Sequence, residues 1–227
     1  METAESGRIL RQLLDARHSC RAFLSDSVPV DLQRQILECA QRSASWCNAQ
    51  PWKVHITQGQ ATERFRKLML AAAAEQEPRP DFEWPKAYEG AYRQRRFDCA
   101  MQLYDSVGIG RGDREASARQ ARENFRLFGA PHVALITSDA QLGVYGAVDC
   151  GAFVANFLLA AASLGIATIP QAALASRPDR VREFFGLAGD RLVVCGISFG
   201  YADRSHPANQ FRTSRADLQD IVSFVSK

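Results

Sequence analysis

Two short polar stretches in the first quarter of the chain carry side chains that could bind a phosphate and a heteroaromatic ring. The first, RHSCRAF at residues 17–23, places Arg17, His18, Ser19 and Arg21 between two apolar stretches. Arginine suits phosphate because its planar guanidinium group donates to two oxygens at once. A solvated loop between helices would have the same composition, so this stretch alone leaves both interpretations open.

The second stretch, SASWCNAQPW at residues 43–52, offers Ser45, Asn48 and Gln50 just before a predicted strand. Side-chain amides both donate and accept hydrogen bonds, so they could bind the edge of a heteroaromatic ring. A polar turn before a strand is common, and alone this pattern is weak. Together the two stretches offer cations for a phosphate and amides for a ring.

A third motif, GISFG at residues 196–200, matches the G-x-S-x-G turn that carries the nucleophile of serine hydrolases. That turn needs a helix directly after the serine, with an acid and a histidine further along the chain. The segment that follows, YADRSHPANQF, is typical of a turn. A hydrolase that uses Ser198 is therefore a minor alternative. Because His, Cys, Asp and Glu are not clustered at metal-ligand spacing, we predict no metal site.

The composition predicts one globular domain without a nucleic-acid or membrane partner. The 227 residues are 46% hydrophobic and 23% charged, and the net charge of +3 is too small to indicate nucleic-acid binding. Six cysteines form no C-x-x-C pair, and the N-terminus lacks the pattern of a signal peptide, so we expect free thiols and a cytoplasmic location. Asp149, Asn156 and Ser163 interrupt the apolar stretch 143–164, which we interpret as a central buried helix.

Hydrophobic periodicity predicts the elements that position these motifs. Helices are expected at 5–16, 31–42 with Asp31 as the cap, 61–76, 92–108, 114–129, 143–164 and 177–187. Strands are expected at 52–58, 132–138 and 191–200, with a capped turn and a last strand within 215–227. Residues 77–90 are irregular and suit either a lid or a long connection. This order is not a regular βαβ alternation, so it favours an α+β sandwich with a mixed sheet.

The motifs together resemble those of the flavin-dependent nitroreductase family. Its members carry R-[RH]-S-x-[RK] near the N-terminus and then S-x-x-N-x-Q-P-W, which here are RHSCR and SWCNAQPW. The resemblance continues in FGAPHVALI, LGIATIPQAAL and GYADRSHPANQFRTSRADL, so it covers essentially the whole chain. The middle of the chain is most similar to the subgroup that reduces nitroaromatic acids such as nitrobenzoate.

The resemblance implies a single domain, 1–227, that folds as an α/β/α sandwich with a mixed, mainly antiparallel sheet and a lid at about 76–128. It implies a homodimer with two FMN sites, each built from both chains. The reaction would be a ping-pong reduction of nitroaromatic compounds, with NADPH or NADH delivering hydride to flavin N5. No side chain needs to act as a nucleophile or base, because positioning and electrostatics suffice.

The resemblance also assigns roles to individual residues. The FMN phosphate would be held by Arg17, His18, Ser19 and either Arg212 or Arg215. The pyrimidine edge of the ring would face Arg21, Ser45, Asn48 and Gln50. A loop of Pro170, Gln171 and Ala172 would cover one face of the ring and direct a backbone N–H towards N5. The candidate aromatic walls for the substrate are Trp46, Tyr88, Tyr92, Phe125 and Phe128.

Several alternatives remain open at this level. Core packing would explain at least half of the aromatic candidates, and Trp46 could fill a dimer core instead of contacting substrate. Arg93, Arg95 or Arg96 could bind a substrate carboxylate or simply be exposed helix arginines. The same fold also supports reductive dehalogenation, quinone or enoate reduction, and flavin destruction. A non-catalytic flavin-binding protein would share the same motifs.

Overall fold

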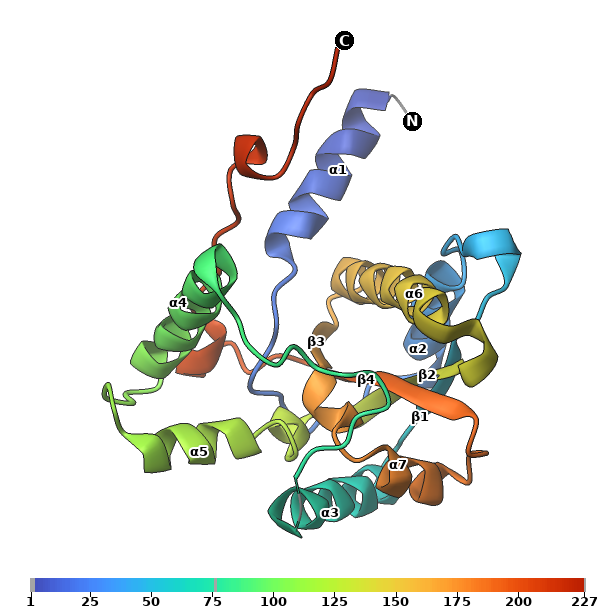
Figure 1. Cartoon of the computed structure of the whole chain (residues 1–227), viewed down its shortest axis with the longest axis vertical. Helices are drawn as coiled ribbons and strands as arrows, with labels where there is room; N and C mark the ends of the chain where they lie inside the picture. The colour runs from blue at the N-terminus through green and yellow to red at the C-terminus, as the bar shows by residue number, and fades with distance from the viewer. Residues whose placement is uncertain (1–2, 76, 227) are drawn as a thin grey trace.

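A four-stranded sheet with helices on both faces forms the body of the protein (Figure 1). The computed structural model describes residues 3–75 and 77–226. Its strands are β1 (Lys53–Ile56), β2 (His132–Asp139), β3 (Ala167–Gln171) and β4 (Arg191–Gly200). They lie in the order β1-β2-β4-β3, and every pairing between these strands is antiparallel.

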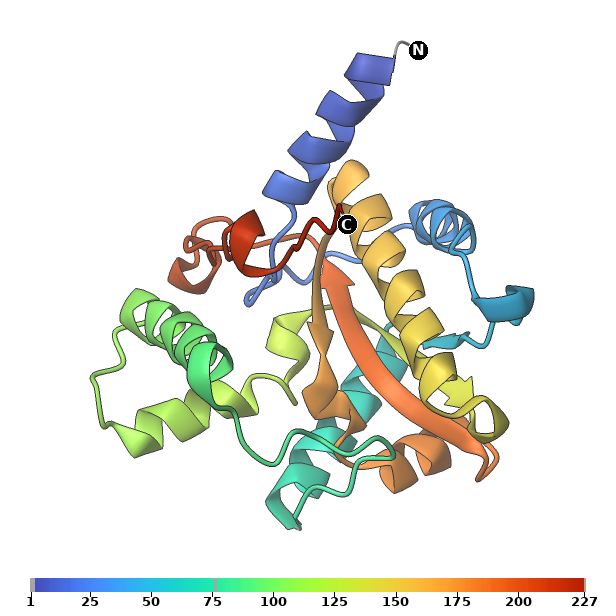
Figure 2. The same ribbon diagram turned by 45° about the horizontal axis from the view of Figure 1, so that its top comes forward.

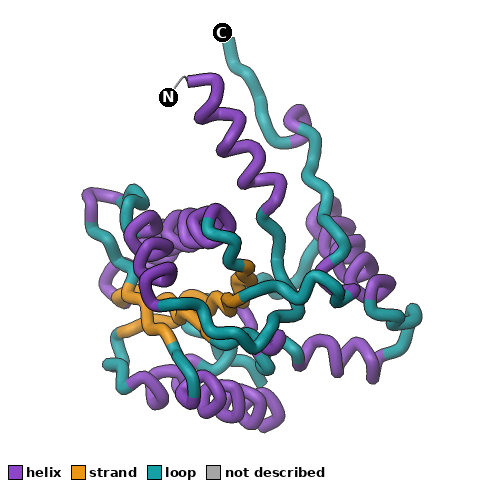
Figure 3. The backbone as a smooth tube through the Cα atoms, turned by 180° about the vertical axis from the view of Figure 1, so that it is seen from behind, coloured by secondary structure: helices purple, strands orange, loops and turns teal. Residues whose placement is uncertain are grey.

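Helices α2 and α6 cover one face of the sheet, and α3 and α7 cover the other (Figures 1 and 3). The helices are α1 (Thr3–Ala16), α2 (Val30–Ala40), α3 (Gln60–Glu75), α4 (Gly90–Ser106), α5 (Arg114–Arg122), α6 (Gly143–Ser163) and α7 (Pro178–Phe185). Each face has its own apolar core, centred on Phe153 and Phe157 on one side and on Phe65 and Met69 on the other. The predicted α+β sandwich is confirmed, but the four described strands pair only antiparallel, and the parallel pairing of a mixed sheet is limited to the bridge between Ser19 and Thr168.

Helix α6 is the central helix that the sequence predicts. Residues 140–163 are apolar and long enough to span a membrane, a test that the core helix of a soluble protein also passes. The helix packs against α2 and the sheet, and Phe153 and Phe157 are only 1% exposed. Its first turns differ, because Val144, Tyr145 and Val148 are 57–66% exposed.

Both ends of the chain project from the layered body (Figure 1), and Figure 2 shows α1 extending away from it. Helix α1 leaves Leu10 and Leu14 each 51% exposed, and Phe224 and Val225 near the C-terminus are 96% and 85% exposed. Both projecting ends therefore carry large apolar side chains that are exposed to water.

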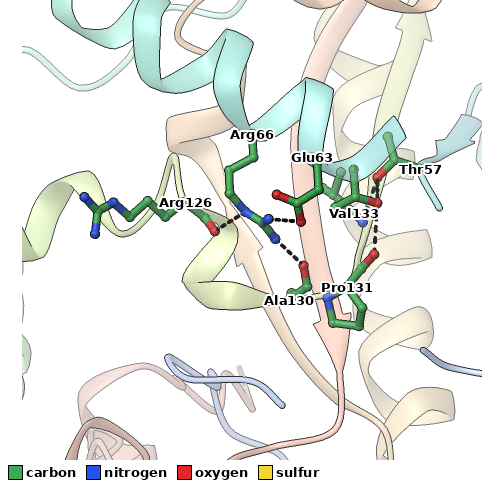
Figure 4. Close-up of polar contacts among 8 residues, drawn as sticks. Thr57, Glu63, Arg66, Arg126, Ala130, Pro131 and Val133 are labelled. Atoms are coloured by element: carbon green, nitrogen blue, oxygen red, sulfur yellow. Dashed lines mark hydrogen bonds and ion pairs between the residues drawn. The ribbon is translucent and has the colours of Figure 1, made fainter. Parts of the chain in front are cut away.

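The region 77–128, which contains α4 and α5, stands beside the layers (Figure 1) and is held to the body near both of its ends. At its start, the Asp81 carboxylate accepts from Arg182 Nη1 and from the Val193 N–H, each at 2.7 Å. Just beyond its end, Arg66 on α3 forms an ion pair with Glu63 and donates to backbone carbonyls at 2.9 and 2.8 Å (Figure 4). The irregular segment 77–89 is therefore anchored near Asp81.

Three predicted boundaries need correction. Pro29 precedes the first residue of α2, so Asp31 lies in the first turn, where its charge suits the helix dipole but does not cap it. The helix predicted at 114–129 ends at Arg122, because Leu127 and Phe128 adopt left-handed φ values of 58° and 52°. The capped turn near the C-terminus is a short 3₁₀ helix.

The last predicted strand is also wrong. Residues 218–220 form that 3₁₀ helix, and residues 221–226 form no strand in the described chain. Conversely, β3 was not predicted, because residues 170–172 were interpreted as a loop. Pro170 lies inside this strand, which is possible at a sheet edge. Gln76, the last residue of the helix predicted at 61–76, lies outside the described residues.

Candidate functional site

The cations of the first motif meet two arginines from the far end of the chain. They line one cavity of about 430 Å³. The predicted residues among its lining are Arg17, His18, Ser19, Arg21, Arg212 and Arg215. Both candidates for the second phosphate cation, Arg212 and Arg215, therefore border the same space.

A buried asparagine that the sequence reasoning missed joins the two segments. Asn209 is 5% exposed, and its Oδ1 accepts from the Arg21 N–H at 2.7 Å. Its Nδ2 donates to the carbonyls of Ala22 and Asp203, and its own carbonyl accepts from Arg212 Nη1 at 2.8 Å. Asn209 thus fixes the chain after β4 against the chain after α1. Only the tertiary structure reveals this role, since no local pattern marks it.

The motif after α1 also runs along the outer edge of β3. The Cys20 N–H donates to the Thr168 carbonyl at 2.9 Å, and Ser19 forms a parallel bridge with Thr168. Cys20 is fully buried, and burial raises the pKa of its thiol to about 11. Its side chain is therefore a neutral packing group, and its backbone helps to hold the cation cavity in place.

Positive charge exceeds negative charge in this cavity, where Asp15 is the one acidic side chain among the lining residues. Among the described residues, none of the four arginines has a carboxylate within salt-bridge distance. Burial lowers the pKa of Arg17, and the nearby charge of Arg215 lowers it further. Burial also lowers the pKa of His18, and Arg212, Arg17 and Arg21 add to this effect. Four guanidinium groups that outnumber this carboxylate and form no ion pair with it make an anion site, and their geometry fits a phosphate ester.

The second motif forms a tightly turned loop. Cys47, Asn48 and Gln50 have φ values of 51°, 56° and 47°, in the left-handed region. The Gln50 N–H donates to Ser45 Oγ at 3.0 Å, and Gln50 Nε2 donates to Asn48 Oδ1 at 3.1 Å. The structure thus brings the three predicted ring-binding residues into contact with one another.

Within one chain, this loop does not join the cation cavity. None of Ser45, Asn48 and Gln50 lines it. Trp46 is 60% exposed and borders a different cavity, of about 270 Å³, where its ring lies 4.7 Å from that of Tyr145. The two motifs are therefore separate parts of the surface of a single chain.

The segment predicted to cover the ring is the end of a strand. Pro170 and Gln171 end β3, and Ala172 begins the 3₁₀ turn Ala172–Ala175. The Gln171 side chain is 3% exposed and bridges the sheet to the lid region, because its Oε1 accepts from Ser198 Oγ at 2.5 Å and its Nε2 donates to the Asn124 carbonyl at 2.8 Å. Because these contacts occupy the Gln171 side chain, a bound cofactor would contact the backbone of Gln171.

The serine hydrolase alternative is wrong. Ser198 is fully buried, and its hydroxyl donates to an amide oxygen and not to a histidine. His206 instead accepts from the Ala208 N–H at 3.2 Å, and the chain after β4 does not enter an α-helix.

Two of the predicted aromatic walls lie at or near the start of α4 and are paired with arginines. The Arg96 guanidinium carbon is 5.3 Å from the ring centroid of Tyr88, and that of Arg95 is 6.0 Å from the ring centroid of Tyr92. Cys99, one helical turn further along, lines the cation cavity. Helix α4 therefore borders the anion site.

The other two aromatic candidates in the lid region pack inward. Phe125 lies against the core cluster around Phe65, and Phe128 is 6% exposed. The backbone carbonyl of Phe128 accepts from the Phe23 N–H at 3.1 Å. Their positions in this chain favour the packing role over contact with a substrate.

Comparison with known proteins gives a consistent result. The model of the nitroreductase family matches residues 14–201. The chain is 33% identical to Nitroreductase NfnB from Mycolicibacterium smegmatis, over 98% of this chain and 95% of the relative. It is 30% identical to a 4-nitrobenzoate reductase from Pseudomonas putida, over 92% of each chain.

A solved structure of similar shape is the FMN-dependent nitroreductase NfnB from Mycobacterium smegmatis in complex with NADPH. It superposes with a TM-score of 0.92 at 33% identity, covering 97% of this chain and 100% of the other. Given the match over residues 14–201 and the shared fold, the chain belongs to the nitroreductase family.

Proposed function

We propose that this protein is an FMN-dependent NAD(P)H oxidoreductase that reduces nitroaromatic compounds. The observation that carries the proposal is the group of four arginines around one cavity, none of them in salt-bridge range of a carboxylate in the described chain although Asp15 also lines it. Arg17 and Arg21 lie within the residues that the family model matches. The relatives named as nitroreductases and nitrobenzoate reductases support the same activity.

The cavity suits the phosphate end of FMN. Arg17, Ser19 and the pair Arg212 and Arg215 would bind its oxygens, because guanidinium and hydroxyl groups are the donors that a phosphate ester prefers. When bound, FMN supplies the hydride transfer from the nicotinamide to the substrate. Arg21, held through its N–H by Asn209, would stabilise the negative charge that a reduced ring carries.

The working unit is proposed to be a homodimer. In a single chain, several large apolar side chains are exposed to water. They are Leu10 and Leu14 on α1, Val144 and Val148 on α6, and Phe224 in the C-terminal segment. A second copy would cover these apolar groups, and it could bring its own Ser45–Gln50 loop to the cation cavity. Two-fold symmetry makes such a contact reciprocal, so each site would be completed by the other chain.

Titration of the apoprotein with FMN tests whether the arginines of the cavity bind the FMN phosphate. Each lost arginine–phosphate interaction should weaken FMN binding about 10- to 100-fold, since hydrogen bonds to charged groups contribute about 1.5–3 kcal/mol. Arg17→Ala and Arg215→Ala should show this loss, and Arg17→Lys a smaller one. Arg64→Ala, an exposed arginine that borders a separate cavity with α7, is the matched control. A wild-type protein that neither binds FMN nor oxidises NADPH or NADH would refute the proposal.

For the substrate we propose an aromatic nitro acid. On α4, Tyr92, Arg95, Arg96 and Cys99 share one helical face, because residues three and four apart are neighbours. Since Cys99 lines the cavity, this face places arginine and tyrosine side chains beside the proposed flavin seat. Arg93 points about a third of a turn away and serves as a control.

Steady-state kinetics with a matched pair of substrates tests this assignment. Arg95→Ala or Arg96→Ala should raise KM for 4-nitrobenzoate about tenfold and leave KM for nitrobenzene within about twofold, the loss expected of one carboxylate contact. Arg93→Ala should change neither value. Equal effects on both substrates would show that the arginines do not recognise the carboxylate.

NADPH and NADH are both proposed as electron donors, and NADPH is the first to test because a relative's structure contains it.

The described cysteines are all free thiols, which suits the cytoplasm as the proposed location. Fractionation of the native host followed by immunodetection would test this location, and a membrane or periplasmic fraction would contradict it.

A further inference from the structure

The three polar residues of the otherwise apolar helix α6 are used in two different ways. Ser163 donates back to the Ala160 carbonyl of its own helix at 2.8 Å. Asp149 and Asn156 instead bind the chain segment 43–50. They are seven residues apart and so lie on the same face of the helix, about two turns from one another.

The contacts fix the segment at two points. Asn156 Nδ2 donates to Ser43 Oγ at 2.7 Å, and that hydroxyl donates to the Ala40 carbonyl at the end of α2. Three residues later, the backbone N–H of Trp46 donates to both oxygens of Asp149, at 3.1 and 3.3 Å. The chain is thus held on α6 immediately before its left-handed residues begin.

The loop needs such support. Left-handed φ values at non-glycine residues cost free energy and persist only where neighbouring contacts enforce them. Three of the four residues 47–50 adopt them. Beyond the anchor, Gln41 Nε2 donates to Gln50 Oε1 at 2.8 Å, and Trp52 Nε1 donates to Gln41 Oε1 at 2.8 Å. The loop is therefore held from α6 on one side and from the end of α2 on the other.

We propose that Asp149 and Asn156 are positioning residues for FMN: they hold segment 43–50 in the conformation that presents Asn48 and Gln50 to the flavin ring, without touching the flavin themselves. This inference rests on the proposed function, in which that segment meets the ring. It explains why a carboxylate and an amide persist on a helix that otherwise contributes apolar packing.

The backbone contact makes the prediction specific to acceptor chemistry. Asp149 works through its oxygens, and an asparagine at this position also has an oxygen that can accept from the Trp46 N–H. The anchor should therefore survive Asp149→Asn and fail in Asp149→Ala. A role for the negative charge itself would predict that both variants lose the anchor alike, since both substitutions remove the charge.

The experiment compares full-length Asp149→Ala, Asp149→Asn and Ser163→Ala with the wild type. FMN affinity is measured by titrating the apoprotein and following flavin fluorescence and the visible absorption bands, which report the surroundings of the ring. Asp149→Ala should weaken FMN binding about 5- to 10-fold and shift the bands, less than the loss of a direct hydrogen bond to a charged group because Asp149 acts through the loop. Asp149→Asn should stay within about twofold, and Ser163→Ala should match the wild type.

Thermal unfolding and light scattering on the same samples exclude a general structural effect. Unchanged FMN affinity and bands in Asp149→Ala would overturn the inference while leaving the proposed function intact. So would an affinity loss accompanied by a changed oligomeric state. If Asp149→Ala does not fold, Asn156→Ala tests the same segment through Ser43, with the same expected loss and the same refuting result. Failure of the wild type to bind FMN would refute the proposed function instead.

Discussion

Removing the Asp81 carboxylate should destabilise the protein and loosen the start of the lid region. Asp81 Oδ2 accepts two hydrogen bonds of 2.7 Å, one from Arg182 Nη1 and one from the Val193 N–H. The side chains of Asp81 and Arg182 are 11% and 20% exposed. Val193 lies next to an irregularity in the pairing of β2 with β4, where Val194 has no partner in the register.

The magnitude follows from what is left behind in Asp81→Ala. Breaking a buried ion pair by removing one partner costs about 3–5 kcal/mol. Arg182 keeps a bond to the Arg191 carbonyl at 3.2 Å and some contact with water, so the lower end of that range applies. We expect a loss of about 3 kcal/mol, which for a domain of this size lowers Tm by about 6–12 °C. Asp81→Asn should lose roughly half as much, because its oxygen can still accept from Val193.

Urea unfolding and calorimetry measure this loss, with Glu183→Ala as the matched control. Glu183 pairs with Arg180 at 3.4 Å on α7, but its side chain is 71% exposed, so its removal should change stability by less than about 0.5 kcal/mol. Limited proteolysis should also cut Asp81→Ala faster within residues 82–89. A loss below about 1 kcal/mol, or equal losses in the two variants, would refute the assignment of Asp81 as an anchor.

Three further predictions concern the body of the protein and its C-terminus. Burial lowers the pKa of His132. As the pH falls, the unfolded chain therefore binds a proton at this histidine before the folded chain does. Stability should therefore fall as the pH drops below about 6.5, the ordinary pKa of histidine, and urea titrations should find this fall reduced in His132→Gln. Gly200→Ala should cost about 1–3 kcal/mol, because its Cβ would lie 2.6 Å from Pro131 Cδ, whereas Gly189→Ala meets open space and should be neutral by thermal denaturation. Deleting residues 218–227 should raise the dimer dissociation constant in analytical ultracentrifugation, and an unchanged constant would argue against a covered C-terminal segment.

Local patterns predicted most elements because their periodicity coincides with the final packing. The helix expected at 143–164 and the strand expected at 191–200 agree with α6 and β4 to within one residue. The prediction extended α5 too far, because apolar residues continue the helical spacing through Phe128. The contacts that hold the chain beyond its end are tertiary: Arg66 donates to the carbonyls of Arg126 and Ala130. No sequence window contains both partners.

The candidate site shows the same limit. The types of the motif residues predicted a seat for an anion, and the cavity does contain Arg17, Arg21, Arg212 and Arg215. Asn209, which joins the segments, was missed because its partners lie nearly two hundred residues away or in an irregular turn. The residue pattern alone did not show that the two motifs lie apart in a single chain; only the family resemblance, which implies sites built from both chains, pointed to it.

That separation is itself an argument for the proposed dimer. The segment 43–50 is anchored at Asp149, whereas Ala162 near the other end of α6 lines a second cavity that also contains Arg17. Thirteen residues of helix span about 20 Å, so the two motifs lie towards opposite ends of α6. A two-fold axis near the middle of α6 would set two such helices antiparallel and place each loop beside the cation cavity of the other chain. The exposed Val144 and Val148 lie on this helix, where such a contact would bury them. Dimerisation would then both complete the FMN site and bury the apolar surface. FMN affinity should therefore depend on protein concentration.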